Sequence, residues 1–171
     1  MARHPVLDPS GLARVASRLG SIIPGFAAYS EPSRLQEDDR ALRKAVGDHL
    51  GLVLGRLDRS RARVAKTLSE TEAADAKHLA ILLARHRDRI HFAPAGGAAR
   101  LEQHRLEDLE SAGLLSLDAG LWAMLEELED LIGSWELETR KGGGTWPGDA
   151  LSSVVTELEA VLDERESFLR S

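Results

Sequence analysis

The stretch Leu117–Trp135 reads LDAGLWAMLEELEDLIGSW, and the spacing of its apolar residues decides the fold class. Apolar side chains recur there every three or four residues, which places them on one face of an α-helix, while the glutamates between them fall outside that face. The apolar stripe consists of Leu117, Leu121, Met124, Leu125, Leu128, Leu131, Ile132 and Trp135. The stretch therefore predicts an amphipathic helix over about residues 116–140.

Two helices are expected before this one in the first half of the chain. Asp8 followed by Pro9 is typical of a helix start and predicts a short helix over about residues 9–22, which Pro24-Gly25 ends. Ser30-Glu31-Pro32 opens a long run of apolar residues at helical spacing, which predicts a helix over about residues 31–69.

Two further helices are marked by their capping signals. Ser69 and Glu72 match a capping box, so a new helix is expected over about residues 72–92. The glycine-rich stretch 141–148 can only be a loop, and Asp149 is a good N-cap for a last helix over 149–170. Gly113 argues against extending the helix at 116–140 toward the N-terminus.

The composition favours helices throughout. A chain of 171 residues fits one domain, and its aromatic content of only 4% is low for a sheet protein. We therefore expect a single all-α domain spanning residues 1–171, in which long antiparallel helices form a four-helix bundle or an elongated coiled-coil-like assembly.

The compartment follows from what the sequence lacks. It has no cysteine, which removes disulfides and thiolate chemistry and fits a reducing compartment. The N-terminus has no apolar signal region, and no apolar run approaches the ~20 residues that a spanning helix requires. A cytoplasmic protein without a transmembrane segment is expected.

Charge is distributed unevenly between the two halves. Residues 1–99 carry 16 Lys or Arg against 11 Asp or Glu, whereas residues 100–171 carry 6 against 17. The halves are thus +5 and −11. The favoured interpretation is that basic and acidic helices complement each other, either within one chain or between subunits; contact with an anionic partner is the alternative.

Three glycines, Gly47, Gly51 and Gly55, are spaced by four within the predicted long helix. Each costs up to ~1 kcal/mol relative to alanine in a helix interior. Their spacing places them near one helical face, where they would let another helix approach closely. Tolerated sequence drift is an equal alternative.

Residues that could carry chemistry do not form a recognisable site. A di-iron bundle requires two acidic-x-x-His motifs, and the nearest match here is the single Asp75-x-x-His78. No His-x-x-x-His spacing, Gly-x-Ser-x-Gly elbow or P-loop is present. We therefore expect no catalytic residues, no cofactor and no metal; a metal-binding bundle around Asp75, His78 and His86 is the third hypothesis.

One basic cluster could meet an anionic surface such as nucleic acid or lipid. It combines five cations with a single acid, Asp58, and has no interleaved aromatic residue, which argues against nucleic acid as the partner. The cluster consists of Arg56, Arg59, Arg61, Arg63 and Lys66.

Two segments carry a resemblance to a known family. The first is Ile23-Pro24-Gly25-Phe26-Ala-Ala-Tyr29 with the charged helix after it, and the second is 89–97 followed by the leucine- and glutamate-rich helix. Together they resemble an uncharacterised family of bacterial helical proteins. Its members begin with an Ile-Pro-Gly-Tyr and a second tyrosine, and they carry an aromatic-rich loop mid-chain. Here Ala95, Gly97, Arg100 and Leu101 replace the aromatic residues of that loop.

The resemblance implies a role rather than an activity. Family members are often associated with SPFH (band 7) or phage-shock-like stress proteins, which implies a scaffold or adaptor beside a membrane-associated protein. The sequence thus favours a non-enzymatic protein that acts through protein–protein contact or self-association, with Phe26 and Tyr29 as candidate contact residues. Structurally, the two rings would instead hold the first helix against the bundle. Binding to an anionic surface through the basic cluster is the second hypothesis.

Overall fold

A computed structural model describes residues 9–92, 101 and 106–170 of the chain. Its elements are α1 (Pro9–Ile22), a 3-10 turn (Pro32–Arg34), α2 (Leu35–Val64), α3 (Glu70–His91), α5 (Asp108–Arg140) and α6 (Gly148–Arg170). The described residues contain no strand, so the all-α prediction is confirmed. None of the helices in this part of the chain is both long and apolar enough to cross a membrane.

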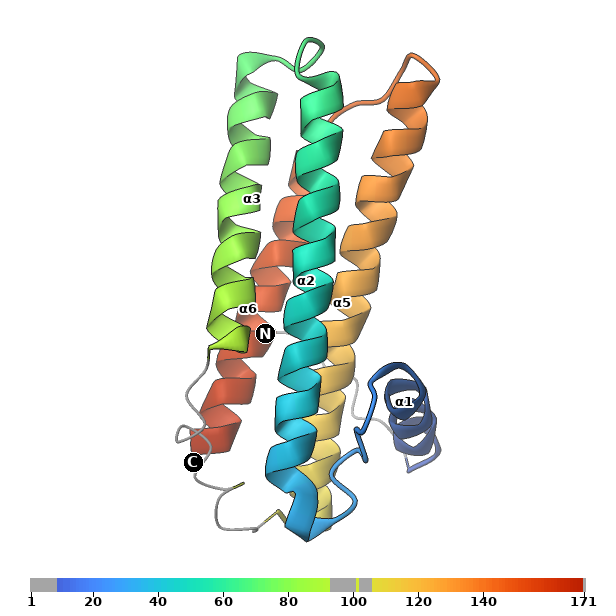
Figure 1. Cartoon of the computed structure of the whole chain (residues 1–171), viewed down its shortest axis with the longest axis vertical. Helices are drawn as coiled ribbons and strands as arrows, with labels where there is room; N and C mark the ends of the chain where they lie inside the picture. Colours follow the sequence, from blue (N-terminus) through green and yellow to red (C-terminus); the bar gives the residue numbers. More distant parts are fainter. Residues whose placement is uncertain (1–8, 93–100, 102–105, 171) are drawn as a thin grey trace.

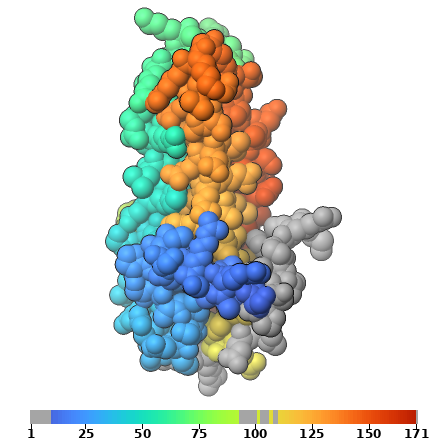
Figure 2. Space-filling view, turned by 90° about the vertical axis from the view of Figure 1, so that its right-hand side faces the viewer, coloured from blue at the N-terminus to red at the C-terminus, as the bar shows by residue number. Residues whose placement is uncertain are grey.

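The four long helices α2, α3, α5 and α6 lie alongside one another (Figure 1). α2 packs against α3 and α5, and α6 packs against the same two helices. The colours in Figure 1 show the chain rising in α2 and α5 and descending in α3 and α6. α1 lies outside this group, where its main packing partner is α5, and Figure 2 shows it across the lower surface of the molecule.

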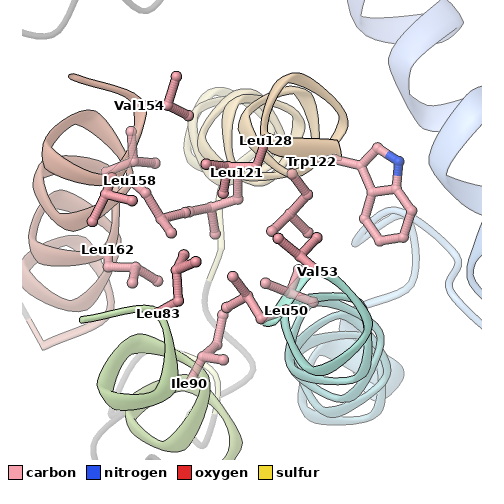
Figure 3. Close-up of a cluster of buried hydrophobic side chains, with 14 of the residues drawn as sticks. Leu50, Val53, Leu83, Ile90, Leu121, Trp122, Leu128, Val154, Leu158 and Leu162 are labelled. Atoms are coloured by element: carbon pink, nitrogen blue, oxygen red, sulfur yellow. The ribbon is translucent and has the colours of Figure 1, made fainter. Parts of the chain in front are cut away.

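The core lies between the four long helices, each of which contributes aliphatic side chains. In Figure 3, Leu50 of α2, Leu83 of α3, Leu121 of α5 and Leu158 of α6 point toward a shared centre. All four are at most 1% exposed. Fully burying a leucine contributes about 1.5–3 kcal/mol relative to leaving it exposed, so the apolar core as a whole is a large stabilising contribution.

The helix starts reflect local hydrogen bonding. The Ser69–Glu72 capping box is present, and the hydroxyl of Ser69 accepts the backbone N–H of Glu72. A second capping box joins Glu107 and Glu110 and starts α5 at Asp108. The expected start near residue 116 is therefore wrong. Gly113 is accommodated inside the helix, where Phe168 of α6 lies 3.7 Å from the position of a Cβ.

α2 is continuous through all three of its spaced glycines. A Cβ on Gly47 would lie 3.2 Å from the Nδ1 atom of His91, so α3 comes close to α2 at this point. A Cβ on Gly55 would meet only Arg59 of the same helix. The close-approach interpretation therefore holds at Gly47 and has no support at Gly55.

The basic and acidic halves meet within one chain. Arg56 of α2 donates to Glu136 of α5 at 2.9 Å, and Arg89 of α3 donates to Glu166 of α6 at 2.7 Å. Arg18 of α1 pairs with Glu126 of α5 at 2.5 Å. Charge complementation between neighbouring helices thus accounts for much of the asymmetry in the sequence.

Trp146 anchors the loop between α5 and α6 to the neighbouring helices α5 and α3. Its ring packs edge-on against Trp135 with centroids 4.9 Å apart, and its Nε1 donates to Asp75 of α3 at 2.6 Å. Both partners of this hydrogen bond lie against Gly148, the first residue of α6, where a Cβ would collide with the carboxylate. Glycine is therefore required at position 148 for steric reasons.

We predict that Gly148→Ala lowers the free energy of unfolding by about 1–3 kcal/mol, because the added methyl group displaces the Asp75–Trp146 hydrogen bond. Urea denaturation measures the change. Gly143→Ala in the same loop is the matched control, since no atom lies within 4 Å of its Cβ position. Equal stabilities for the two variants would contradict this account.

Candidate functional site

Four polar side chains are buried together where the chain leading from α1 meets α2, α5 and α6. Tyr29, Asp39, Asp118 and Arg165 are 3%, 5%, 0% and 4% exposed, and we call them the buried ion cluster. Sequence analysis proposed only Tyr29 of these residues, and the other three were missed.

Arg165 of α6 is the centre of this cluster. Its Nε donates to Oδ1 of Asp118 in α5 at 2.7 Å, and its second guanidinium nitrogen donates to Asp39 of α2 at 2.8 Å. The Tyr29 hydroxyl donates to the other oxygen of Asp118 at 2.6 Å. Arg43 completes the pairing with a 2.8 Å hydrogen bond to Asp39, so the two carboxylates face two guanidinium groups.

The electrostatics of the cluster fix its protonation states. Burial and the neighbouring Asp118 carboxylate raise the pKa of Tyr29 well above its usual value, so its hydroxyl stays protonated. Burial lowers the pKa of Arg165, but Asp118, Tyr29 and Asp39 raise it overall. Arg165 therefore remains charged. Burial also raises the pKa of the Asp118 carboxyl above its usual value, although the charge and hydrogen bond of Arg165 act in the opposite direction.

The backbone before α2 is held by the adjacent Asp38. Its carboxylate accepts the backbone N–H groups of Ala27 and Tyr29 at 2.9 and 2.7 Å. Ala28 and Tyr29 have φ values of 53° and 59°, a region that costs non-glycine residues of order 1–3 kcal/mol. These hydrogen bonds offset that strain and place the Tyr29 ring in the cluster. The arrangement joins helices and leaves no opening for a substrate to reach these side chains.

We predict that Arg165→Met lowers the free energy of unfolding by about 3–5 kcal/mol, because it leaves Asp39 and Asp118 buried without their common partner. Equilibrium urea unfolding followed by circular dichroism gives the value. Arg170→Met on the same helix is the control, since that side chain is 69% exposed and its ion pair with Glu166 contributes little. A loss below about 1 kcal/mol for Arg165→Met would show that the cluster is not a main stabilising feature.

The two aromatic residues proposed as contact residues lie in the core. Phe26 and Tyr29 are 6% and 3% exposed, and their rings pack edge-on with centroids 5.3 Å apart. A partner could not reach either ring in this conformation. Their position agrees with the structural interpretation, in which the two rings hold the segment after α1 against the long helices.

The basic cluster is divided between internal ion pairs and solvent. Arg56 donates to Glu136, Arg63 lies 3.9 Å from the same carboxylate, and Arg61 pairs with Asp58. Arg59 and Lys66 are exposed. Glu136 also accepts a hydrogen bond from Ser60; burial raises its pKa, but Ser60 and Arg56 lower it overall. Part of the cluster is thus neutralised by α5 before any anionic surface could meet it.

The residues of the metal hypothesis are not brought together. Asp75 accepts a hydrogen bond from Trp146, His78 is exposed, and His86 is buried at 1% exposure. In residues 9–92, 101 and 106–170, no group of three His, Cys, Asp or Glu side chains could hold an ion.

His86 is buried in the core, and its pKa is lowered. It lies on the core face of α3, and neither ring nitrogen has a hydrogen-bond partner. Burial, the largest effect, lowers its pKa together with Arg89 and Arg85, while Glu159 and Asp163 of α6 act in the opposite direction. His86 is therefore neutral at pH 7.

We predict that acid destabilises the protein through His86. Below the unfolded-state pKa of about 6.5, this histidine is protonated in the unfolded chain, whereas the lowered pKa keeps it neutral in the folded protein. The free energy of unfolding therefore decreases by up to about 1.4 kcal/mol for each unit by which the pH falls. Urea unfolding between pH 7 and 5 measures the slope. His86→Leu should flatten it, whereas His78→Leu at an exposed position should leave it unchanged. Equal slopes for the wild type and His86→Leu would refute the assignment.

A pocket lies at the α5–α6 loop, at the opposite end of α5 from its start. It measures about 440 Å³ and is lined by Arg63, Thr67, Trp135, Thr139 and the loop glycines among others. The Thr67 hydroxyl donates to the carbonyl of Val64, the last residue of α2, and the Thr139 hydroxyl donates to the carbonyl of Trp135 within α5. Both threonine hydroxyls of the pocket thus already bond backbone carbonyls near the C-terminal ends of α2 and α5.

A surface groove between α2 and α3 is the second candidate. It measures about 570 Å³, and its floor lies where Gly47 and Gly51 carry no side chain. Leu52 and Phe92 line it and are 68% and 74% exposed. The remaining lining residues are Asp48, Arg87, Asp88 and His91, and we call the whole surface the α2–α3 groove. Large exposed apolar side chains beside a depression are typical of a protein contact surface.

No protein-family model, curated protein or solved structure matches the chain. The roles of the α2–α3 groove and the buried ion cluster are therefore argued from the contacts and burial described above.

Proposed function

We propose that the protein is a non-enzymatic helical adaptor or scaffold of the cytoplasm, which acts by contact with another protein. The α2–α3 groove carries this proposal, because it places Leu52 and Phe92 in solvent next to a depression in the surface. The buried ion cluster is by contrast closed to solvent, and its hydrogen bonds join α2, α5 and α6.

The proposed rigid unit is an antiparallel four-helix bundle. Each of α2, α3, α5 and α6 packs against two neighbours around one apolar core, and successive long helices run in opposite directions in Figure 1. Such a unit presents fixed helix faces, so a groove on one face keeps its shape before a partner arrives. Preformed surfaces bind with a smaller loss of conformational entropy.

The family resemblance supports the same type of function. Gly25 of the Ile23-Pro24-Gly25 segment has a φ of 80°, a conformation that glycine adopts without strain, and the following rings are buried. The segment thus has a structural reason to be present in a helical family. Under this proposal a membrane-associated scaffold of the SPFH or phage-shock type is one candidate partner.

We predict that tagged protein isolated from its native cells retains a protein partner through the groove. Leu52→Glu should abolish that retention, because it places a charge on the apolar wall. Leu137→Glu is the matched control, since this α5 leucine is similarly exposed, at 54%, but lies away from the groove. Quantitative mass spectrometry of the eluates, with an untagged copy of the chain co-expressed, measures the difference.

Two results would count against the proposal. The first is that nothing, including the untagged copy, is enriched with the wild type. The second is that retention survives Leu52→Glu as well as it survives Leu137→Glu, which would place the contact elsewhere on the protein.

A further inference from the structure

We infer that the pocket at the α5–α6 loop binds a small organic molecule with a single negative charge, a monocarboxylate, and that Trp135 and Arg63 hold its acidic group. We call this site the loop pocket. It shares no lining residue with the α2–α3 groove. The inference therefore goes beyond the adaptor function proposed above and does not depend on it.

The loop pocket lies at one end of the four long helices. Figure 1 shows the connection from α2 to α3 and the connection from α5 to α6 at the same, upper end of the molecule. The lining comes from the end of α2, the first turn of α3, the last turns of α5 and the loop that follows. Its volume of about 440 Å³ falls within the range of roughly 300–1,000 Å³ that is typical of small-molecule sites.

The indole N–H of Trp135 is a buried donor without an acceptor. Trp135 lines the loop pocket and is 3% exposed, and its Nε1 has no hydrogen-bond partner among the described residues. The neighbouring Trp146 differs, since its Nε1 donates to Asp75. Buried indole N–H groups usually find a partner, because an unpaired buried donor is costly. A ligand that accepts a hydrogen bond in the loop pocket would supply this partner.

The guanidinium group of Arg63 is the second donor. Its side chain is 56% exposed, and its one ion pair among the described residues, with Glu136, spans 3.9 Å. That distance is too long for a hydrogen bond, so the N–H donors of Arg63 are available to a ligand. Hydrogen bonds from a guanidinium group to an anion are roughly twice as strong as neutral ones. Arg63 and Trp135 together therefore suit an acidic group that accepts several hydrogen bonds.

The one carboxylate that lines the loop pocket is already bonded. Glu72 accepts hydrogen bonds from the backbone N–H and the hydroxyl of Ser69. These bonds, together with one from the backbone of Trp146, lower its pKa, so it stays ionised. Glu72 thus ties the loop to the start of α3 and repels a second negative charge in the pocket.

The charges around the pocket set the charge of the ligand. A smaller adjoining cavity shares Arg63 with the loop pocket and adds Arg140 and Glu136. Arg56 pairs with Glu136 at 2.9 Å. Three arginines thus surround the site with two glutamates, Glu72 and Glu136, which leaves a local sum of +1. This sum matches a monoanion, whereas a phosphate monoester carries roughly −1.5 to −2 at pH 7.

The other walls of the pocket suit an apolar body. Val64 at the end of α2, Leu68 after it and the ring of Trp135 line the pocket and pack against the core. The loop contributes three consecutive glycines, 142–144, so no side chain from this segment fills the space. We therefore assign the loop pocket to a carboxylate that carries a short aliphatic chain.

Titration with hexanoate, followed by the indole N–H signals in proton–nitrogen NMR correlation spectra, tests the site. Trp135→Phe identifies the Trp135 signal by its disappearance. In the wild type, hexanoate should move this signal downfield in a saturable way, because Nε1 gains an acceptor. Trp122 is the internal control, since it lies about 20 Å earlier along α5 and its signal should not move.

Matched arginine variants test the role of Arg63. Arg63→Gln should weaken hexanoate binding by about tenfold or more, because the acidic group loses a charged donor. Arg59→Gln should bind as the wild type does, since this exposed arginine lies one turn earlier on α2 and does not line the pocket. Unshifted Trp122 signals in the ligand-free variants show that the fold is kept.

Matched probes test the charge of the ligand. Hexanamide has the same chain without the charge, and hexyl phosphate adds charge, so both should bind more weakly than hexanoate. A Trp135 signal that does not move with hexanoate into the millimolar range overturns the inference, and so does equal binding by Arg63→Gln or by hexanamide. Tighter binding of hexyl phosphate overturns the assignment to a monoanion. The adaptor function is tested separately, because Leu52→Glu alters the α2–α3 groove and leaves the loop pocket intact.

Discussion

The structure depends on one ionic contact, the fork of Arg165 between Asp39 and Asp118. It joins α6 to α2 and α5, and through the Tyr29 hydroxyl it also joins the segment that leads from α1. Apolar packing supplies most of the free energy of folding, but aliphatic side chains tolerate small shifts of one helix along another. A guanidinium group with fixed donor directions tolerates much less, so the cluster sets how the helices are aligned. Full pairing of its charges is what makes the burial of so many polar atoms tolerable.

Much of the fold could be predicted from the sequence because it depends on local patterns. The apolar stripe of Leu117–Trp135 and the Ser69–Glu72 capping box both predicted helices that the structure contains. The start of α5 was misjudged because Gly113 was weighed as a helix breaker, while the Glu107–Glu110 capping box was overlooked. A glycine costs about 1 kcal/mol in a helix, and the packing of Leu114 and Phe168 around it outweighs that cost.

The buried ion cluster was missed although part of its signal is present in the sequence. Asp118 lies between Leu114 and Leu121, and Arg165 lies between Leu162 and Leu169, so each charge occupies an apolar position of its helix. That placement alone indicates a buried charge in need of a partner. The identity of the partner could not be predicted, because Asp39 and Arg165 are separated by most of the chain and meet only when α2, α5 and α6 are packed together.

The position of α1 has a consequence for how the molecule opens. α1 packs mainly on α5, and Leu19 is buried there, while Leu12, Val15 and Ala16 are only partly buried. The turn that follows α1 is fixed by the hydrogen bond from the Tyr29 backbone to Asp38. Unfolding of α1 would remove Leu19 from the core but would leave the packing among α2, α3, α5 and α6 in place, so amide protons of α1 should exchange with solvent before those of α2 or α5. On this account α1 opens separately from the four long helices, and the Asp38 carboxylate, which holds the segment between α1 and α2, marks the boundary between the two parts.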